Sequence, residues 1–193
     1  MIDKIINEAS GAVVAAVQGV DNIVGAVTGA VKNQVVNALQ STGEVGTTTV
    51  EAVASVANGA VKGAGQTGGT VVNVIGDTMS GVVKGTSQVS GDVISAVRGG
   101  AKGVVQGTAE TGGDVGQAAV SAVQGAINSA GEVGADTAEA AKAAVGGALD
   151  AATDVGGDAT QTVRDALLSA AALPRDVVEA ALKGSDESNP NKS

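Results

Sequence analysis

Apolar residues recur along the chain at steps of three or four positions from Val71 to Ala170. The step averages about 3.67 residues, which is the eleven-residue, three-turn period of a long amphipathic helix and differs from the 3.5 of a heptad coiled coil. The pattern predicts an all-α chain in which these side chains form one seam, on one long helix or on a helix broken at glycine-rich sites into a bundle. The larger seam residues, expected to contact lipid or a partner helix, are Val71, Ile75, Met79, Val82, Val89, Val93, Val97, Val104, Val115, Val123, Val133, Val145, Val155 and Val163.

A short repeat runs through the same region. A triplet of a small residue, a polar residue and valine, loosened toward the end of the chain, begins at positions 43, 69, 91, 113, 131, 153 and 175. The mean spacing is 22 residues, or two eleven-residue units, and the spacings that differ from it differ by four residues, about one helical turn. A helical register accounts for departures of this size. We therefore treat residues 1–172 as one repeat-built helical region.

Several positions are expected to interrupt the helix. The segment 40–49 is poor in helix formers and is the first candidate hinge, and the glycine pairs at 68–69, 99–100, 112–113, 146–147 and 156–157 are further candidates. Pro174 should end the long helix, since proline disfavours helical geometry in the residue before it and lacks an amide donor. We expect a short amphipathic helix over 173–183 and a disordered polar tail over 184–193.

Composition limits the possible chemistry. The 193 residues include no Cys, no His and no aromatic residue, so we expect no catalytic residue, no metal site and no cofactor, and the chain is not expected to be an enzyme. A net charge of −9 argues against nucleic acid as a partner. No stretch reaches the roughly 20 apolar residues of a transmembrane span, and the acidic start is unlike a secretory signal, which suggests a cytoplasmic protein.

The 30 glycines allow two interpretations. Spacings such as 59–63, 81–85, 99–103–107 and 112–116 would permit close approach of helices. Alternatively, the glycines keep the free chain loosely ordered until it meets a surface, in which case changing Gly85, Gly91, Gly103 and Gly107 to Ala would give a stable, more helical protein. The sequence leads us to expect the second interpretation, in which the alanine variant is stable and more helical.

Residues 101–111, Ala-Lys-Gly-Val-Val-Gln-Gly-Thr-Ala-Glu-Thr, and residues 81–86, Gly-Val-Val-Lys-Gly-Thr, resemble the eleven-residue repeats of perilipins and, more distantly, those of synucleins. The resemblance covers most of residues 9–170 and concerns the style of the repeat. It implies a long helix lying on a lipid surface. This chain departs from the lysine-rich synuclein repeats by being acidic, so the resemblance favours a neutral surface.

The sequence thus predicts a non-enzymatic coat protein, peripheral on a lipid droplet or storage granule, whose weak binding per turn accumulates with length. The main alternative is a self-assembling structural protein, in which the Val/Ala/Gly seam packs against other copies as a homo-oligomer or folds back on itself. Two less favoured alternatives are a stress protectant, since such proteins also use eleven-residue repeats, and an ice-binding protein, for which the threonines keep no strict eleven-residue ladder.

Overall fold

A computed structural model describes residues 2–18, 23–42, 47–66 and 71–187 of the chain, and these residues form helices and turns without a strand. The all-α prediction is confirmed. Of the two arrangements that the sequence left open, the single long helix is wrong, because the described helices are only 11 to 20 residues long. Their bounds are α1 Ile2–Gln18, α2 Ile23–Thr42, α3 Thr47–Gln66, α4 Val71–Gln88, α5 Val93–Glu110, α6 Val115–Glu132, α7 Thr137–Val155, α8 Ala159–Ser169 and α9 Arg175–Glu187.

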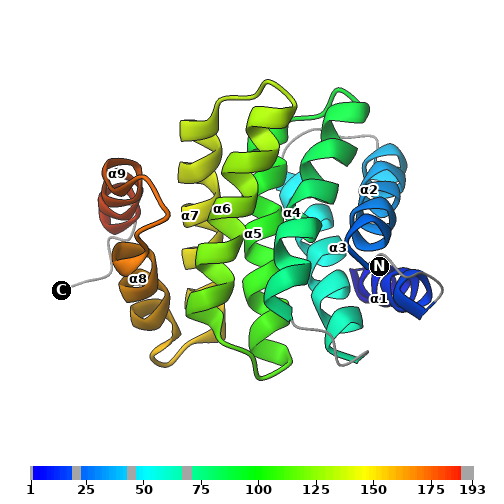
Figure 1. Cartoon of the computed structure of the whole chain (residues 1–193), viewed down its shortest axis with the longest axis horizontal. Coiled ribbons are helices and arrows are strands. Elements are labelled where there is room, and N and C mark those ends of the chain that lie inside the picture. Colours follow the sequence, from blue (N-terminus) through cyan, green and yellow to red (C-terminus); the bar gives the residue numbers. More distant parts are fainter. Residues whose placement is uncertain (1, 19–22, 43–46, 67–70, 188–193) are drawn as a thin grey trace.

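The helices form two layers. From α1 to α5, each helix packs more extensively against the helix two places further along the chain than against the next one, and α6 also contacts α8, so α1, α3, α5 and α7 share one layer and α2, α4, α6 and α8 share the other. The last helix, α9, packs mainly against α7. Figure 1 shows the helices following one another from α1 and α2 at one end of the molecule to α8 and α9 at the other. The chain is therefore a stack of helical repeats in which each helix contacts only near neighbours.

Capping aspartates set the length of the repeat. Asp92, Asp114, Asp136 and Asp158, spaced 22 residues apart, directly precede α5, α6, α7 and α8. The first three accept hydrogen bonds from backbone N–H groups of the first helical turn, for example from Ile94 at 3.0 Å and from Ser95 at 3.1 Å onto Asp92. Such caps satisfy N–H groups that have no partner within the helix.

This register corrects the predicted triplets. Those at 91 and 113 do mark helix starts, whereas those at 131 and 153 fall at the C-terminal ends of α6 and α7. Following valine rather than the capping aspartate produced the apparent slip of four residues between the triplets at 113 and 131. Glycines with positive φ follow or end three helices, at Gly112 (72°), Gly134 (75°) and Gly156 (80°), where a side chain would be strained.

The predicted interruptions meet different outcomes. α2 ends at Thr42 and α3 begins at Thr47, while residues 43–46 of the expected hinge and the pair at 68–69 lie outside the described residues. The pairs at 112–113 and 156–157 lie in turns, but those at 99–100 and 146–147 lie inside α5 and α7, so a break there is wrong. α9 begins directly after Pro174 and continues to Glu187, which contradicts a disordered tail over 184–187; residues 188–193 lie outside the described part.

The seam is largely buried between helices of the same chain. Ile75, Met79, Val82, Val97, Val104, Val123, Val145 and Val163 are inaccessible to solvent. Val89, Val93, Val115 and Val133, near helix ends, are partly buried, Val155 is 45% exposed, and the side chain of Val71 is outside the described part. No helix within the described residues is long and apolar enough to cross a membrane.

Glycines inside the helices bring neighbours within a layer into backbone contact. A Cβ built on Gly81 or Gly85 of α4 would lie 2.8 Å from a carbonyl oxygen of α2, that of Thr28 or Lys32. Cβ atoms on Gly99 and Gly103 of α5 would overlap the carbonyl oxygens of Val50 and Ala54 in α3. Close approach is thus the role of these glycines, and the contacts argue against the expectation that alanine at 85, 91, 103 and 107 would give a stable, more helical protein.

We expect Gly103→Ala to lower the free energy of unfolding by about 1–3 kcal/mol, because the new methyl group forces α5 away from the backbone of α3. Gly76→Ala is the matched control: it lies within α4 with nothing near the new Cβ, and the higher helix propensity of alanine should add up to about 1 kcal/mol. Urea denaturation of both variants measures the two changes in the free energy of unfolding, which should have opposite signs. Equal effects would contradict the close-contact role.

We expect Asp92→Ala to cost about 0.5–2 kcal/mol through loss of the α5 cap, whereas Asp158→Ala, where the side chain makes no capping hydrogen bond, should cost less.

The hydrogen bonds from the Ser95 side chain and backbone, with that from the Ile94 backbone, lower the pKa of Asp92 below its ordinary 3.8. The stabilisation is therefore present above that value and lost as the pH falls through the lower pKa of the folded state. The free energies of unfolding of the wild type and of Asp92→Ala, measured as a function of pH, should therefore converge below about pH 4. A gap that persists in acid would contradict the capping role of the carboxylate.

Candidate functional site

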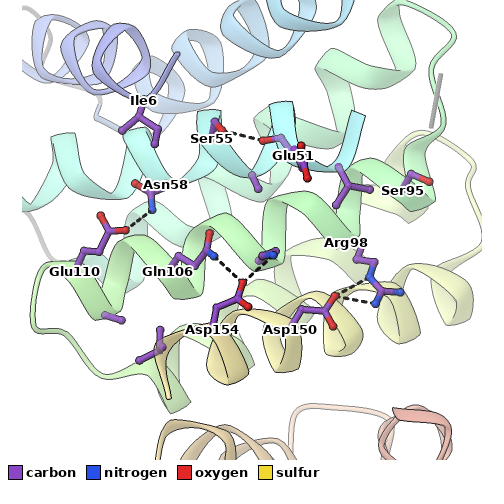
Figure 2. Close-up of a pocket in the computed structure, with 15 residues that line it drawn as sticks. Ile6, Glu51, Ser55, Asn58, Ser95, Arg98, Gln106, Glu110, Asp150 and Asp154 are labelled. Carbon is purple, nitrogen blue, oxygen red and sulfur yellow. Dashed lines mark hydrogen bonds and ion pairs between the residues drawn. The ribbon is translucent and has the colours of Figure 1, made fainter. Parts of the chain in front are cut away.

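A groove of about 1070 Å³ lies across the layer formed by α1, α3, α5 and α7. Ten of its fifteen lining residues are polar or charged: Glu51, Ser55, Asn58, Ser95, Arg98, Lys102, Gln106, Glu110, Asp150 and Asp154. Ile6, Val50, Ala54, Ala109 and Val155 complete the lining. Figure 2 shows the polar side chains of α3, α5 and α7 arranged in successive rows.

Helical spacing produces each row. Glu51, Ser55 and Asn58 are four and three residues apart, which places them on one face of α3. Arg98, Lys102 and Gln106 follow one another at four-residue steps on α5, and Asp150 and Asp154 do so on α7. Because the helices of a layer lie side by side, a row of bases and amides on one helix faces a row of acids on the next.

Two equivalent three-residue clusters cross the groove. In the first, Glu110 of α5 receives Lys62 Nζ at 2.6 Å and Asn58 Nδ2 at 3.2 Å, both from α3. In the second, Asp154 of α7 receives Lys102 Nζ at 2.8 Å and Gln106 Nε2 at 3.2 Å, both from α5. Each carboxylate is thus shared between an ammonium group and an amide from the helix before it in the layer.

Two further ion pairs follow the same rule. Arg98 NH2 lies 2.8 Å from Asp150 Oδ2, and in the other layer Lys84 Nζ lies 2.9 Å from Glu132 Oε2. These side chains are 41% to 58% exposed, so each pair contributes only about 0–1 kcal/mol. Their regularity fixes the register of neighbouring helices more than it adds stability.

Hydrogen-bond acceptors without donors remain in the groove. The Asn58 side chain is 4% exposed, and its Oδ1 is buried without a hydrogen-bond partner. Its Nδ2 is already held by Glu110, so the amide cannot turn to satisfy the oxygen without breaking that bond. Within the described part of the chain, no donor reaches the amide oxygen of Gln106 and no cation pairs with the exposed Glu51 carboxylate. The groove therefore offers acceptors in excess.

The acidic side chains of the groove are spread over three helices. The described residues contain no group of three or more acidic side chains that could hold a metal ion. Asp150 and Asp154, adjacent along α7, are each engaged by a base from α5. The groups of the groove that have no partner within the described residues are acceptors, suited to receiving hydrogen bonds.

The sequence-predicted seam and this groove are nearly separate. Of the seam residues only Val155 lines the groove, and the others with described side chains lie in the core or at helix ends. Sequence reasoning missed Asn58, Gln106 and the acids that hold them. One signal was present: partners within a layer are 48 or 52 residues apart, which is two 22-residue repeats plus one or two helical turns.

A scan of protein-family models finds no match to this chain, and a search of curated proteins finds no similar sequence.

We expect Asn58→Leu to keep or raise the free energy of unfolding, because it removes a buried oxygen whose missing hydrogen bond costs about 1–3 kcal/mol. The hydrogen bond lost to Glu110 is partly replaced by water, since Glu110 is exposed and stays paired with Lys62. Thermal and urea unfolding measure the change. Val61→Ala, a truncation at a fully buried position on the same helix, is the destabilising reference. If Asn58→Leu loses as much free energy of unfolding as Val61→Ala, the Asn58 amide stabilises the fold.

Proposed function

We propose that this chain is a non-enzymatic helical-repeat scaffold that binds an extended segment of a partner polypeptide in the groove across α1, α3, α5 and α7. The single observation that carries the proposal is the groove lining, with polar side chains in rows from three successive helices and unused acceptors among them. Stacked helical repeats commonly present such extended surfaces to their partners.

The character of the groove favours a polypeptide over a small molecule. Small-molecule sites have a few polar groups at particular points, whereas ten of the fifteen residues that line this groove are polar or charged and stand in rows along three helices. Four helices at about 8–10 Å spacing give a width that an extended segment of about eight residues spans. Backbone N–H groups at regular intervals along such a segment match rows of acceptors.

A lipid-coat function is less well supported by this geometry. A coat helix must turn its apolar stripe toward the surface, but the valines and alanines of the seam pack among themselves. Within the described residues only Val155 and Leu168 are large exposed apolar side chains. The stacked helices would have to separate before the side chains of the seam could contact lipid. The same burial leaves little of the seam for assembly between copies.

Selection from a random peptide library on the full-length chain tests the proposed function. We expect selected peptides to bind the wild type and to lose about tenfold or more in affinity for Gln106→Trp, since the indole fills the groove between α3 and α7. Gln117→Trp, an exposed position on α6 outside the groove, is the control and should bind as the wild type does.

Circular dichroism of both tryptophan variants verifies that the helices are retained. Selected peptides that bind equally to the two variants would place the binding surface elsewhere. If the purified protein instead partitions onto a neutral oil emulsion with exposure of its buried seam, the coat function replaces the scaffold.

A further inference from the structure

We propose that the bound segment is basic, and that its Lys or Arg side chains and N–H groups are received along the α3 side of the groove by Glu51, Asn58 and Glu110. This inference rests on the proposed function and specifies the chemistry of the partner. We refer to these three residues as the acceptor row.

The charge balance of the groove supports a cationic partner. The lining contains four carboxylates, Glu51, Glu110, Asp150 and Asp154. Arg98 and Lys102 of the lining pair with the two α7 acids, and Lys62 pairs with Glu110, so none of these cations is available to neutralise Glu51. The carboxylate that remains without a cation is therefore Glu51, on α3. The chain as a whole, at −9, adds long-range attraction for a positive segment.

Asn58 gives the second, independent observation. Asn58 lines the same side of the groove; its amide oxygen is buried and has no donor, while its nitrogen is hydrogen-bonded to Glu110. Glu51 and Asn58 are seven residues apart on α3, about 10.5 Å along the helix axis. Residues about three apart in one extended segment cover that distance. A segment whose cation pairs with Glu51 can thus place a further donor beside Asn58.

The acceptor row also selects among donors. A guanidinium carries five N–H donors and an ammonium three, and both have charge to match the carboxylates. A neutral donor gains only the hydrogen bonds, and an acidic segment meets the unpaired like charge of Glu51. The preference should therefore run from basic to neutral to acidic and weaken with added salt.

Three fluorescein-labelled peptides of about ten residues test the inference, alternating Ser with Arg, with Gln or with Glu. Fluorescence anisotropy with the full-length chain should show tightest binding of the Arg peptide and weakest binding of the Glu peptide. Glu51→Gln should weaken the Arg peptide by about two- to fivefold and leave the Gln peptide unchanged. This variant should unfold as the wild type does, because the described structure gives the Glu51 carboxylate no ion-pair partner to lose.

Glu139→Gln, an exposed acid on α7 outside the groove lining, makes the same change in net charge and should alter affinity by less than about 1.5-fold. Equal losses for Glu51→Gln and Glu139→Gln would overturn the acceptor row. Binding of all three peptides with one affinity, abolished by Gln106→Trp, would overturn the basic preference and leave the peptide groove standing. If none of the three peptides binds and library selection also fails, the proposed function fails with the inference.

Discussion

Backbone-to-backbone contact between helices of the same layer, made possible by glycine, is the constraint on which the rest of this structure depends. Gly59, Gly99, Gly103 and Gly147 each admit a carbonyl oxygen of the preceding helix in the layer where a Cβ would sit. Valine and alanine bury little area each, so a chain without aromatic residues gains stability by bringing many small groups together closely. The helix propensity lost at each glycine, about 1 kcal/mol, is offset by that packing.

The same close contacts build the groove. Helices held at short distance bring side chains from neighbouring rows within hydrogen-bond reach, which is how Lys62 and Asn58 meet Glu110 and how Lys102 and Gln106 meet Asp154. Each such cluster uses the amide nitrogen and leaves an amide oxygen without a donor. A repeating solution to helix register thereby generates a repeating set of acceptors on one face. The fold and the candidate site have one origin.

The period of the chain was readable because it reflects local backbone geometry. Apolar steps of about 3.67 residues follow from helical side-chain placement, and a 22-residue repeat follows from duplicated helices. The repeat alone does not distinguish one long helix from many short ones, since both place the same residues on the same face. The distinguishing residues are Asp92, Asp114 and Asp136, each of which caps the start of a new helix. Their spacing is regular, but valine, the more conspicuous residue, led the triplet into the wrong register.

By itself the sequence determined the helical class, the repeat length, the apolar seam and the lack of histidine and cysteine chemistry, because each depends on residue type and local spacing. Only the tertiary structure decided what the seam packs against and which polar residues meet. Glu110 and Lys62 are 48 residues apart, and a continuous helix would separate them by about 72 Å. Folding back at the caps brings their charged atoms to 2.6 Å. Contacts of that kind depend on the path of the chain, so the groove appears only when the path is known.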